Sequence, residues 1–301
     1  MLSVPRLDLL DPAEVARLGG IELVAEGVVE GYLAGLHRSP FRGFSVEFTE
    51  HRSYQPGDEL RYLDWRMLAR SDRLFVKQFE EETNLKAVIV LDVSRSMVWR
   101  GSRERLTKRA YADRLAAALA LILLRQRDAT GLVCFDDDVR AVVPARVKAG
   151  QFARVVRALV ETGGGGATVA APALRRVTDL LARRGLVVFV SDLLFDRELA
   201  LTALRYLRHR GHQVVLFHLM DPAEYRLEGP AEVRFRDLES PASVVVRPKE
   251  VARVYRETVD GVIQAWHTQC RRHGIAYHHV TTDTPFGHAL RRAADTRRRL
   301  G

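Results

Sequence analysis

Cysteine is scarce in this sequence: the 301 residues contain only Cys134 and Cys270, which lie far apart and form no CxxC pair. Neither a disulfide framework nor a zinc cluster is therefore indicated, and this usage fits a reducing compartment. Cys134 lies within an apolar run, where we expect it to be a small buried hydrophobic residue. The length of the chain excludes a knottin or a short peptide.

Long hydrophobic runs are also missing. The longest apolar run, residues 115–124, is about half of the roughly 20 residues that a membrane-spanning helix needs, and it is flanked by Arg114 and Arg125. The first residues of the sequence carry Asp8 and lack a basic head followed by an apolar stretch, so no secretory signal is visible. We therefore expect a cytoplasmic protein with no membrane span.

Acidic residues are fewer than basic ones, because 38 Asp and Glu face 47 Lys and Arg and give a formal net charge of +9. Such an excess suits an acidic partner, which could be nucleic acid, an anionic membrane or an acidic protein. The arginines are scattered through helix-like segments rich in Ala, Leu and Val, a pattern that is typical of solvated helix faces. Nucleic-acid binding would rest on charge alone, and we do not expect it.

The pattern of apolar residues predicts an α/β fold from residue 86 onward. Short apolar runs alternate with helical periodicity, which indicates βαβ crossovers and a doubly wound, mostly parallel sheet. The expected strands are 87–91, 131–135, 139–144, 186–190, 213–219 and 275–280, and the expected helices are 106–127, 151–160, 171–183, 197–210, 249–273 and a short one ending at 297–299.

The N-terminal part of the chain has a different pattern, so we divide the sequence into two parts. Residues 1–83 are expected to form an amphipathic helix over 11–36, followed by a small layer of short strands and loops. Residues 84–301 form the α/β domain. Within it, residues 221–248 are irregular and polar, and we expect two short edge strands there that extend the sheet.

Polar side chains follow two of the predicted buried strands at the point where each strand ends. Asp92, Ser94 and Ser96 come after the first strand, and Asp192 comes after the strand 186–190. Ligands bind to open parallel sheets outside the carboxyl ends of the strands. Carboxylate and hydroxyl oxygens without His or Cys are the donors that Mg²⁺ prefers, so zinc is not expected.

The segment DVSRS, residues 92–96, resembles the DxSxS signature of the metal-ion-dependent adhesion site of von Willebrand factor A domains. Thr168, after the glycine run, and Asp192 are similar to the other two loops of that site. The resemblance implies that Ser94, Ser96 and Thr168 bind the metal directly, while Asp92 and Asp192 act through bound water. The implied ion is Mg²⁺, with Mn²⁺ or Ca²⁺ as alternatives. In related families an acidic residue follows the threonine, whereas here it is Val169.

A second resemblance lies upstream of that site and extends the similarity over about residues 41–192. The chain resembles the bacterial DUF58 family in His51, Arg52, Tyr54, Gln55, Pro56, Gly57 and Asp58, in Arg61, Asp64 and Trp65, and in Lys77, Phe79, Glu80 and Glu81. This family is associated with MoxR-type AAA+ ATPases. The resemblance therefore implies a MoxR-type ATPase as a partner.

These features together predict a non-enzymatic adaptor that binds an acidic residue of a partner protein through the metal. A carboxylate of the partner would complete the coordination of the ion. Basic residues follow directly after the metal loop and are expected to form a positive rim that accelerates association with an acidic partner. The proposed rim consists of Arg95, Arg100, Arg103, Arg105, Lys108 and Arg109.

The main alternative is a Mg²⁺-dependent phosphate-handling enzyme with Asp92 as its nucleophile. Strand-end aspartates act in this way in phosphatases similar to haloacid dehalogenases, whose signature is DxDx. Here Ser94 stands at the position of the second aspartate, which removes the expected general acid. Ser94 is not in a GxSxG elbow, so a serine hydrolase has little support.

Three other clusters are interpreted as structural features without a functional role. The glycine run 163–166 lacks the features of a phosphate-binding loop and is interpreted as a tight turn. The acidic trio 136–138 is expected at a solvated hairpin tip. His278 and His279 are neighbours in a predicted strand and point to opposite faces, which argues against joint metal binding.

Overall fold

A six-stranded sheet forms the centre of the molecule, in the strand order β10-β7-β6-β3-β4-β5. The computed structural model describes residues 20–37, 51–53, 75–77, 86–163, 170–181, 184–227, 229–236 and 242–292. The strands are β3 (Lys86–Asp92), β4 (Ala129–Phe135), β5 (Val139–Arg146), β6 (Leu186–Ser191), β7 (Gln213–Met220) and β10 (Ala276–Thr281). Only β5 runs antiparallel to its neighbour, so the predicted mostly parallel sheet is confirmed.

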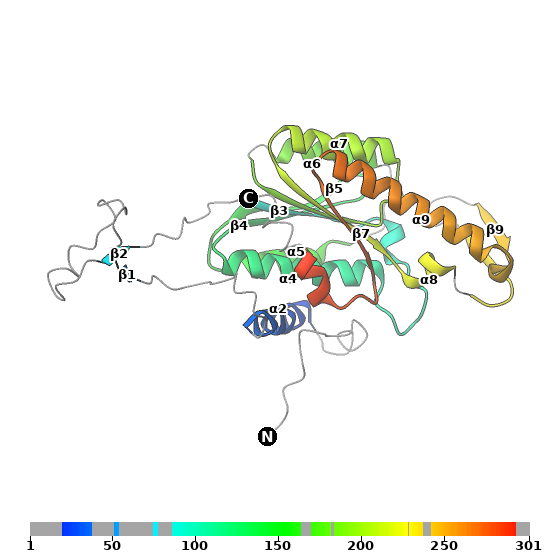
Figure 1. Ribbon diagram of the computed structural model, residues 1–301, viewed down its shortest axis with the longest axis horizontal. Coiled ribbons are helices and arrows are strands. Elements are labelled where there is room, and N and C mark those ends of the chain that lie inside the picture. Colours follow the sequence, from blue (N-terminus) through cyan, green and yellow to red (C-terminus); the bar gives the residue numbers. More distant parts are fainter. Residues whose placement is uncertain are drawn as a thin grey trace, which may run out of the picture.

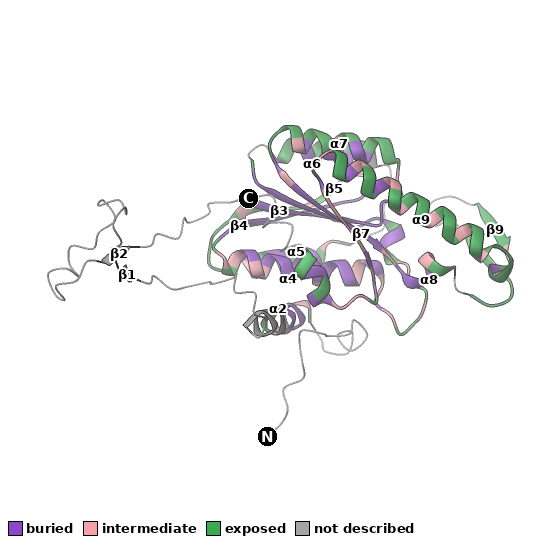
Figure 2. Ribbon diagram, in the orientation of Figure 1, coloured by how far each residue is buried: buried purple, intermediate pink, exposed green. Residues whose placement is uncertain are grey.

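Helices cover both faces of this sheet (Figure 1). On one face lie α4 (Lys108–Arg125) and α5 (Gln151–Glu161); on the other lie α6 (Ala170–Leu180), α7 (Arg197–His209) and α9 (Pro248–Arg272). In β3, Ile89 and Leu91 belong to the apolar cluster on the α4 side, while Val90 belongs to the cluster on the other side. This alternation buries both faces of the strand, and Figure 2 shows the central strands of the sheet in the buried colour.

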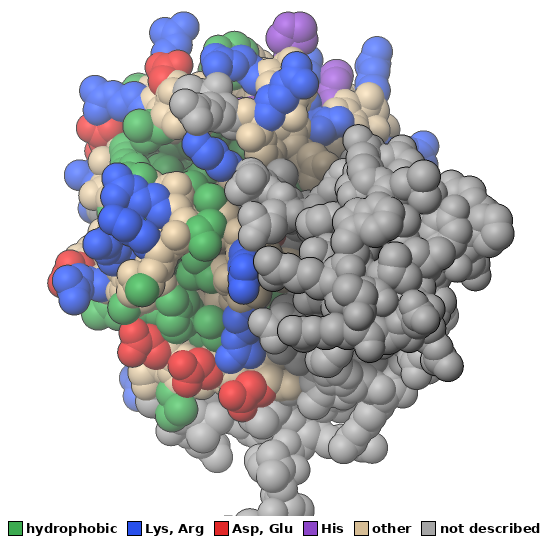
Figure 3. Space-filling view, turned by 90° about the vertical axis from the view of Figure 1, so that its left-hand side faces the viewer, with side chains coloured by type: hydrophobic (Ala, Val, Ile, Leu, Met, Phe, Trp, Pro, Cys, Tyr) green, Lys and Arg blue, Asp and Glu red, His purple; other side chains and the backbone are tan. Residues whose placement is uncertain are grey.

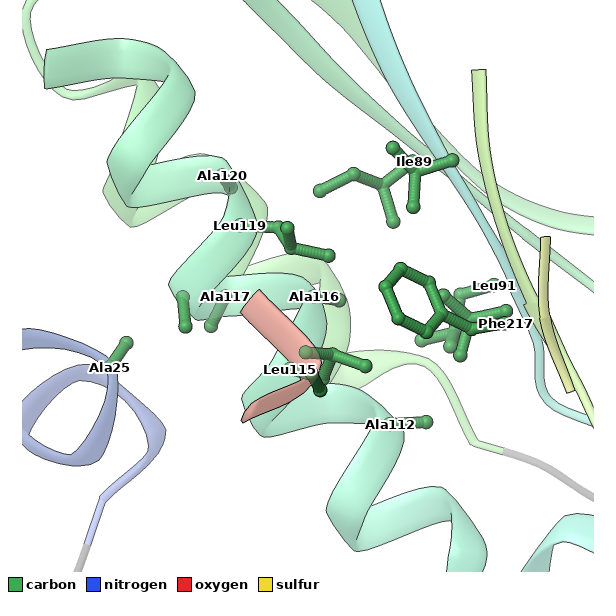
Figure 4. Close-up of a cluster of buried hydrophobic side chains, with 14 of the residues drawn as sticks. Ala25, Ile89, Leu91, Ala112, Leu115, Ala116, Ala117, Leu119, Ala120 and Phe217 are labelled. Atoms are coloured by element: carbon green, nitrogen blue, oxygen red, sulfur yellow. The ribbon is translucent and has the colours of Figure 1, made fainter. Parts of the chain in front are cut away.

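The helix α2 (Ile21–His37) adds a further layer on the outer side of α4. Figure 4 shows Ala25 of α2 facing Ala117 of α4, while Ala116 of α4 lies on the side of Ile89 and Phe217. Small side chains on α4 therefore let it pack between a helix and the sheet. The predicted division of the chain at residues 83 and 84 stays a prediction, although α2 shares one apolar cluster with α4.

The structure of the segment 221–248 differs from the prediction that its strands extend the central sheet. It contains the short helix α8 (Pro222–Arg226), and its strands β8 (Val233–Arg236) and β9 (Ser243–Val246) pair only with each other, in a separate antiparallel sheet. The prediction that they extend the central sheet is wrong, because β10 already pairs with the free side of β7. Figure 1 places this hairpin at the outer end of α9.

Short strands in the N-terminal part are confirmed by β1 (His51–Ser53) and β2 (Phe75–Lys77), which pair antiparallel. The remaining residues that carry the DUF58 resemblance upstream of residue 86 lie outside the described residues. Near the C-terminus, residues 286–292 are helical, and the predicted end of that helix at 297–299 also lies outside them.

Candidate functional site

The strands that follow β3 in the sequence lie first on one side of it and then on the other. The topological switch point of the sheet is therefore at the carboxyl ends of β3 and β6. From β3 the chain adds β4 and β5 on one side and then β6, β7 and β10 on the other. Asp92 is the last residue of β3, and Ser191 is the last residue of β6. Ligands bind at such points in open α/β sheets.

Asp92 is fully buried at this point, and both of its carboxylate oxygens accept hydrogen bonds. The backbone N–H of Ser94 donates to Oδ1 at 2.9 Å, and the hydroxyl of Ser191 donates to Oδ2 at 2.6 Å. Burial and, after it, the nearby carboxylate of Asp192 raise the pKa of Asp92 to about 7, against these hydrogen bonds. The site thus brings two carboxylates together in a place where one of them is costly to ionise.

The next turn of the chain presents two hydroxyls. The 3-10 helix η3 (Arg95–Val98) follows Ser94, and the hydroxyls of Ser94 and Ser96 form a hydrogen bond with their Oγ atoms 3.1 Å apart, both residues being buried. Mg²⁺ binds oxygens at about 2.0–2.1 Å in octahedral geometry, so two adjacent ligand oxygens lie about 3.0 Å apart. The hydroxyl pair therefore fits two neighbouring positions around this ion.

Both carboxylate oxygens of Asp192 accept hydrogen bonds. Its Oδ1 accepts from the backbone N–H of Leu194 at 3.2 Å, and its Oδ2 accepts from the ammonium of Lys108 at 2.8 Å. The turn depends on Leu193, whose φ of 55° is left-handed, which costs a non-glycine residue about 1 kcal/mol. The Leu193 side chain is buried in the apolar cluster beneath α6 and α7, which holds this conformation.

Lys108 does not lie on the predicted positive rim. It is fully buried and forms ion pairs with Asp192 at 2.8 Å and with Glu224 at 2.5 Å, so it belongs to the interior of the site. Burial alone would lower the pKa of Lys108, but the two carboxylates outweigh it and raise that pKa above its ordinary value. The expectation that Lys108 is part of an exposed rim is wrong, since it shares the buried helix face with Tyr111 and Leu115.

The other predicted rim residues differ in their exposure and in their ion-pair partners. Arg105 pairs with Asp221 at 2.9 Å, and Arg109 pairs with Asp113 at 2.7 Å. Of the predicted rim, the exposed members are Arg95, Arg100 and Arg103. Figure 3 shows the side of the molecule that faces left in Figure 1, where basic side chains are dispersed among apolar and acidic ones.

Sequence reasoning missed the acidic residues of α8. Asp221 and Glu224 form a capping box, in which Asp221 accepts from the N–H of Ala223 at 2.8 Å and its own N–H donates to Glu224 Oε2 at 2.9 Å. The spacing of these two residues around Pro222 is a known helix-start signal. It was hidden because the whole segment was interpreted as irregular.

His218 is a second buried residue that sequence reasoning missed. It lies on β7 directly opposite Ser191 of β6, and its Nδ1 is 2.7 Å from the hydroxyl of Tyr277. Burial, and then His279, lower the pKa of His218 to about 3, so its ring is neutral at physiological pH. A neutral ring beside the site adds no charge to it.

Thr168, the fifth predicted ligand, and Val169 lie outside the described residues, so four of the five predicted metal residues can be placed. Among the described parts of the chain, no group of three or more His, Cys, Asp or Glu side chains is arranged to hold a metal. The predicted set contains only two carboxylates and takes its other donors from hydroxyls.

The acidic trio 136–138 lies in the turn between β4 and β5, as expected for a hairpin tip. Arg140 pairs with Asp136 and Asp137, and Arg176 pairs with Asp138. His278 and His279 lie on opposite faces, since the ring of His278 is near Phe217 and that of His279 is near His218. The hairpin position of the trio and the opposite orientation of the two histidines are confirmed. Asp136 is buried, however, so the expectation of a fully solvated trio is wrong for that residue.

No helix within the described residues is both long enough and apolar enough to cross a membrane.

Comparisons with known proteins place the chain among relatives without an assigned role. It is 29% identical over 248 residues to "Uncharacterized protein Rv1480" of Mycobacterium tuberculosis, covering 79% of this chain and 75% of the relative. The same values hold for "Uncharacterized protein Mb1516" of Mycobacterium bovis.

Two solved structures are similar at low identity. The hypothetical protein BatB of Bacteroides thetaiotaomicron is 14% identical, covers 72% of this chain and 98% of its own, and has a TM-score of 0.47. An aerotolerance-related membrane protein of Bacteroides fragilis is 18% identical, with coverages of 71% and 99% and a TM-score of 0.45. The family model described as "Protein of unknown function DUF58" matches residues 50–260, and the chain therefore belongs to the DUF58 family.

Proposed function

We propose that this protein is a Mg²⁺-dependent adaptor that captures an acidic side chain of a partner protein at the carboxyl ends of β3 and β6. The observation that carries the proposal is the 3.1 Å separation of the Ser94 and Ser96 hydroxyl oxygens beside the buried Asp92. Hydroxyls at this spacing suit a hard cation, and the two neighbouring aspartates supply the negative charge that attracts it.

The roles of the residues follow from their positions. Ser94 and Ser96 would bind the ion directly with Thr168, while Asp92 and Asp192 would hold ordered water around it. Asp92 already orients the loop by accepting the Ser94 N–H. The direct ligands are neutral hydroxyls and the aspartates act only through water, so the charge of a divalent cation would be partly neutralised and would attract a further carboxylate. That carboxylate would come from the partner.

We extend the proposal from the mixed α/β architecture to a specific fold type and a specific partner. We assign the domain to the von Willebrand factor A type, in which this set of loops forms an adhesion site. The partner implied by the DUF58 resemblance is a MoxR-type AAA+ ATPase. Arg95 and Arg103, both exposed, would attract the acidic surface that carries the ligating carboxylate.

The test is capture of a MoxR-type ATPase from the same organism by the purified protein, with Mg²⁺ or with EDTA. Capture by the unchanged protein should require Mg²⁺ and should be lost in the double variant Ser94→Ala, Ser96→Ala. The matched control is Ser102→Ala, whose hydroxyl contacts Glu104 at 3.2 Å instead. Equal capture by all three proteins, with and without EDTA, would reject the proposal.

The phosphate-handling alternative gains no support from the surroundings of Asp92. That side chain is fully buried and both of its oxygens accept hydrogen bonds, which does not favour attack on a phosphate ester. The alternative stays a prediction. Mg²⁺-dependent turnover of phosphate esters that is abolished in Asp92→Asn would revive it.

A further inference from the structure

We infer that Lys108 is an internal counter-ion of Asp192 that weakens and thereby tunes the binding of a divalent cation at the strand ends. The inference rests on the proposed function and adds to it a residue that sets cation affinity.

The position of Lys108 is unfavourable for a cation unless both of its acidic partners are present. It is the first residue of α4, where the helix dipole disfavours positive charge, and it is fully buried, where any unpaired charge is costly. Its Nζ lies 2.8 Å from Asp192 Oδ2 and 2.5 Å from Glu224 Oε1. The two carboxylates are therefore what hold the ammonium in place.

This pairing changes the charge that a metal would meet. When both are ionised, Asp92 and Asp192 together carry two negative charges, and the ammonium of Lys108 offsets the one on Asp192. Its Nζ already donates to Asp192 Oδ2 at 2.8 Å, so that oxygen has less capacity left to hold a water. A divalent cation near Asp192 is thus repelled by Lys108 and competes with it for the same carboxylate.

Glu224 is a second acidic partner of Lys108, and this ion pair can persist when Asp192 interacts with a metal. Glu224 belongs to α8, where it closes the capping box, and its carbonyl accepts a hydrogen bond from the Tyr255 hydroxyl of α9 at 2.7 Å. One side chain therefore links the candidate metal site to α8. Binding of a cation should loosen that link on the Asp192 side.

The test measures Mg²⁺ binding directly by isothermal titration calorimetry on folded protein, with no partner present. In Lys108→Met, which keeps the buried apolar stem, the dissociation constant for Mg²⁺ should fall about tenfold, because a repelling charge is removed. The double variant Lys108→Met, Glu224→Gln removes both ends of the outer pair and should bind Mg²⁺ equally tightly. Arg109→Met, which removes a neighbouring charge paired with Asp113, is the matched control and should bind as the unchanged protein does.

The outcomes separate the two ideas. Tighter binding in the Lys108 variants alone supports the inference, even if the unchanged protein binds Mg²⁺ too weakly to measure. Binding by the unchanged protein that does not tighten in these variants overturns the role of Lys108 and leaves the proposed function standing. Absence of binding in every variant overturns both.

A measurement on the unchanged protein covers the case in which both Lys108 variants fail to fold. Hydrogen–deuterium exchange of the α8 amides, residues 223–226, should become several-fold faster when excess Mg²⁺ is added, because Lys108 then ties α8 less firmly to β6. Unchanged exchange in α8 while Mg²⁺ protects the 92–98 loop would overturn the inference.

Discussion

Carboxylates gather in two regions of this molecule, and the two regions treat them in opposite ways. At the strand ends, Asp92 and Asp192 are buried, and burial raises the pKa of Asp92 to about 7. At the β4–β5 turn, Asp138 is exposed, and hydrogen bonds from the N–H of Val139 and from Arg176 lower its pKa. Sequence alone shows both regions only as clustered acids. Asp136 in the turn is buried as well, but hydrogen bonds, including one from Arg140, lower its pKa. Burial and the partners of each carboxylate together decide which cluster is under electrostatic stress and can gain from a cation.

The largest expected effect concerns the buried cation of the strand-end region. Lys108→Ala should reduce the free energy of unfolding by about 3–5 kcal/mol, because the buried Asp192 and the partly buried Glu224 then lose their shared partner. Urea denaturation measures this loss. A loss as small as that of a surface ion pair would show that water enters the site freely and that the contrast between the two regions is false.

The second effect depends on pH. The folded state keeps a proton on Asp92 up to about pH 7, whereas an unperturbed aspartate has a pKa of 3.8, so the folded form binds more protons in this window and stability falls as the pH rises through it. Asp92→Asn should remove this dependence. In EDTA the variant should be more stable than the unchanged protein by about 4 kcal/mol at about pH 8, and nearly equal to it at about pH 4.

Asp138→Asn is the control for this prediction, because the pKa of Asp138 is lowered and its charged form is the favoured one. The control should not gain stability at high pH. If Asp92→Asn were destabilised at both pH values, the carboxylate would be ionised and well solvated in the folded protein.

A third effect probes the packing between the metal loop and α8. A Cβ added at Gly101 would lie 2.3 Å from Ala223 Cβ and 2.7 Å from Asp221 Oδ1, so Gly101→Ala should cost about 1–3 kcal/mol. At Gly261 in α9 nothing lies within 4 Å of an added Cβ, and Gly261→Ala should be neutral or slightly stabilising. Equal thermal midpoints of the two variants would contradict the close contact.

The smallest effect is expected at the hairpin tip. Arg176→Ser removes the partner of Asp138, but both side chains are exposed, and pairs of this kind contribute little. The urea midpoint should stay within experimental error. A clear loss would mean that the acidic trio depends on its arginines in the same way as the strand ends depend on Lys108.

The sequence predicted the sheet well because its strands are short, continuous apolar runs such as 186–190 that only a doubly covered sheet can bury. It also predicted that Asp92 and Asp192 meet, since parallel strands end at one edge. It failed at Lys108 because charged residues were assumed to be solvated. The spacing of Lys108, Tyr111 and Leu115 on one helix face was the available signal.

The prediction for residues 221–248 failed for a different reason. Two short strands can join a sheet or pair with each other, and local pattern does not distinguish these outcomes. The decision came from β10, which lies far along the chain and takes the edge of β7. Only the tertiary arrangement contains that information.

The length of α9 has a mechanical consequence. Its 25 residues span about 37 Å, and near its C-terminal end Trp266 and Cys270 are buried against the sheet. Farther out, the hydroxyl of Tyr225 in α8 donates to Asp260 at 2.9 Å, and the β8–β9 hairpin lies at the outer end. Because the helix is rigid and anchored near Trp266, a small tilt at its contact with α8 would displace the hairpin by a larger distance.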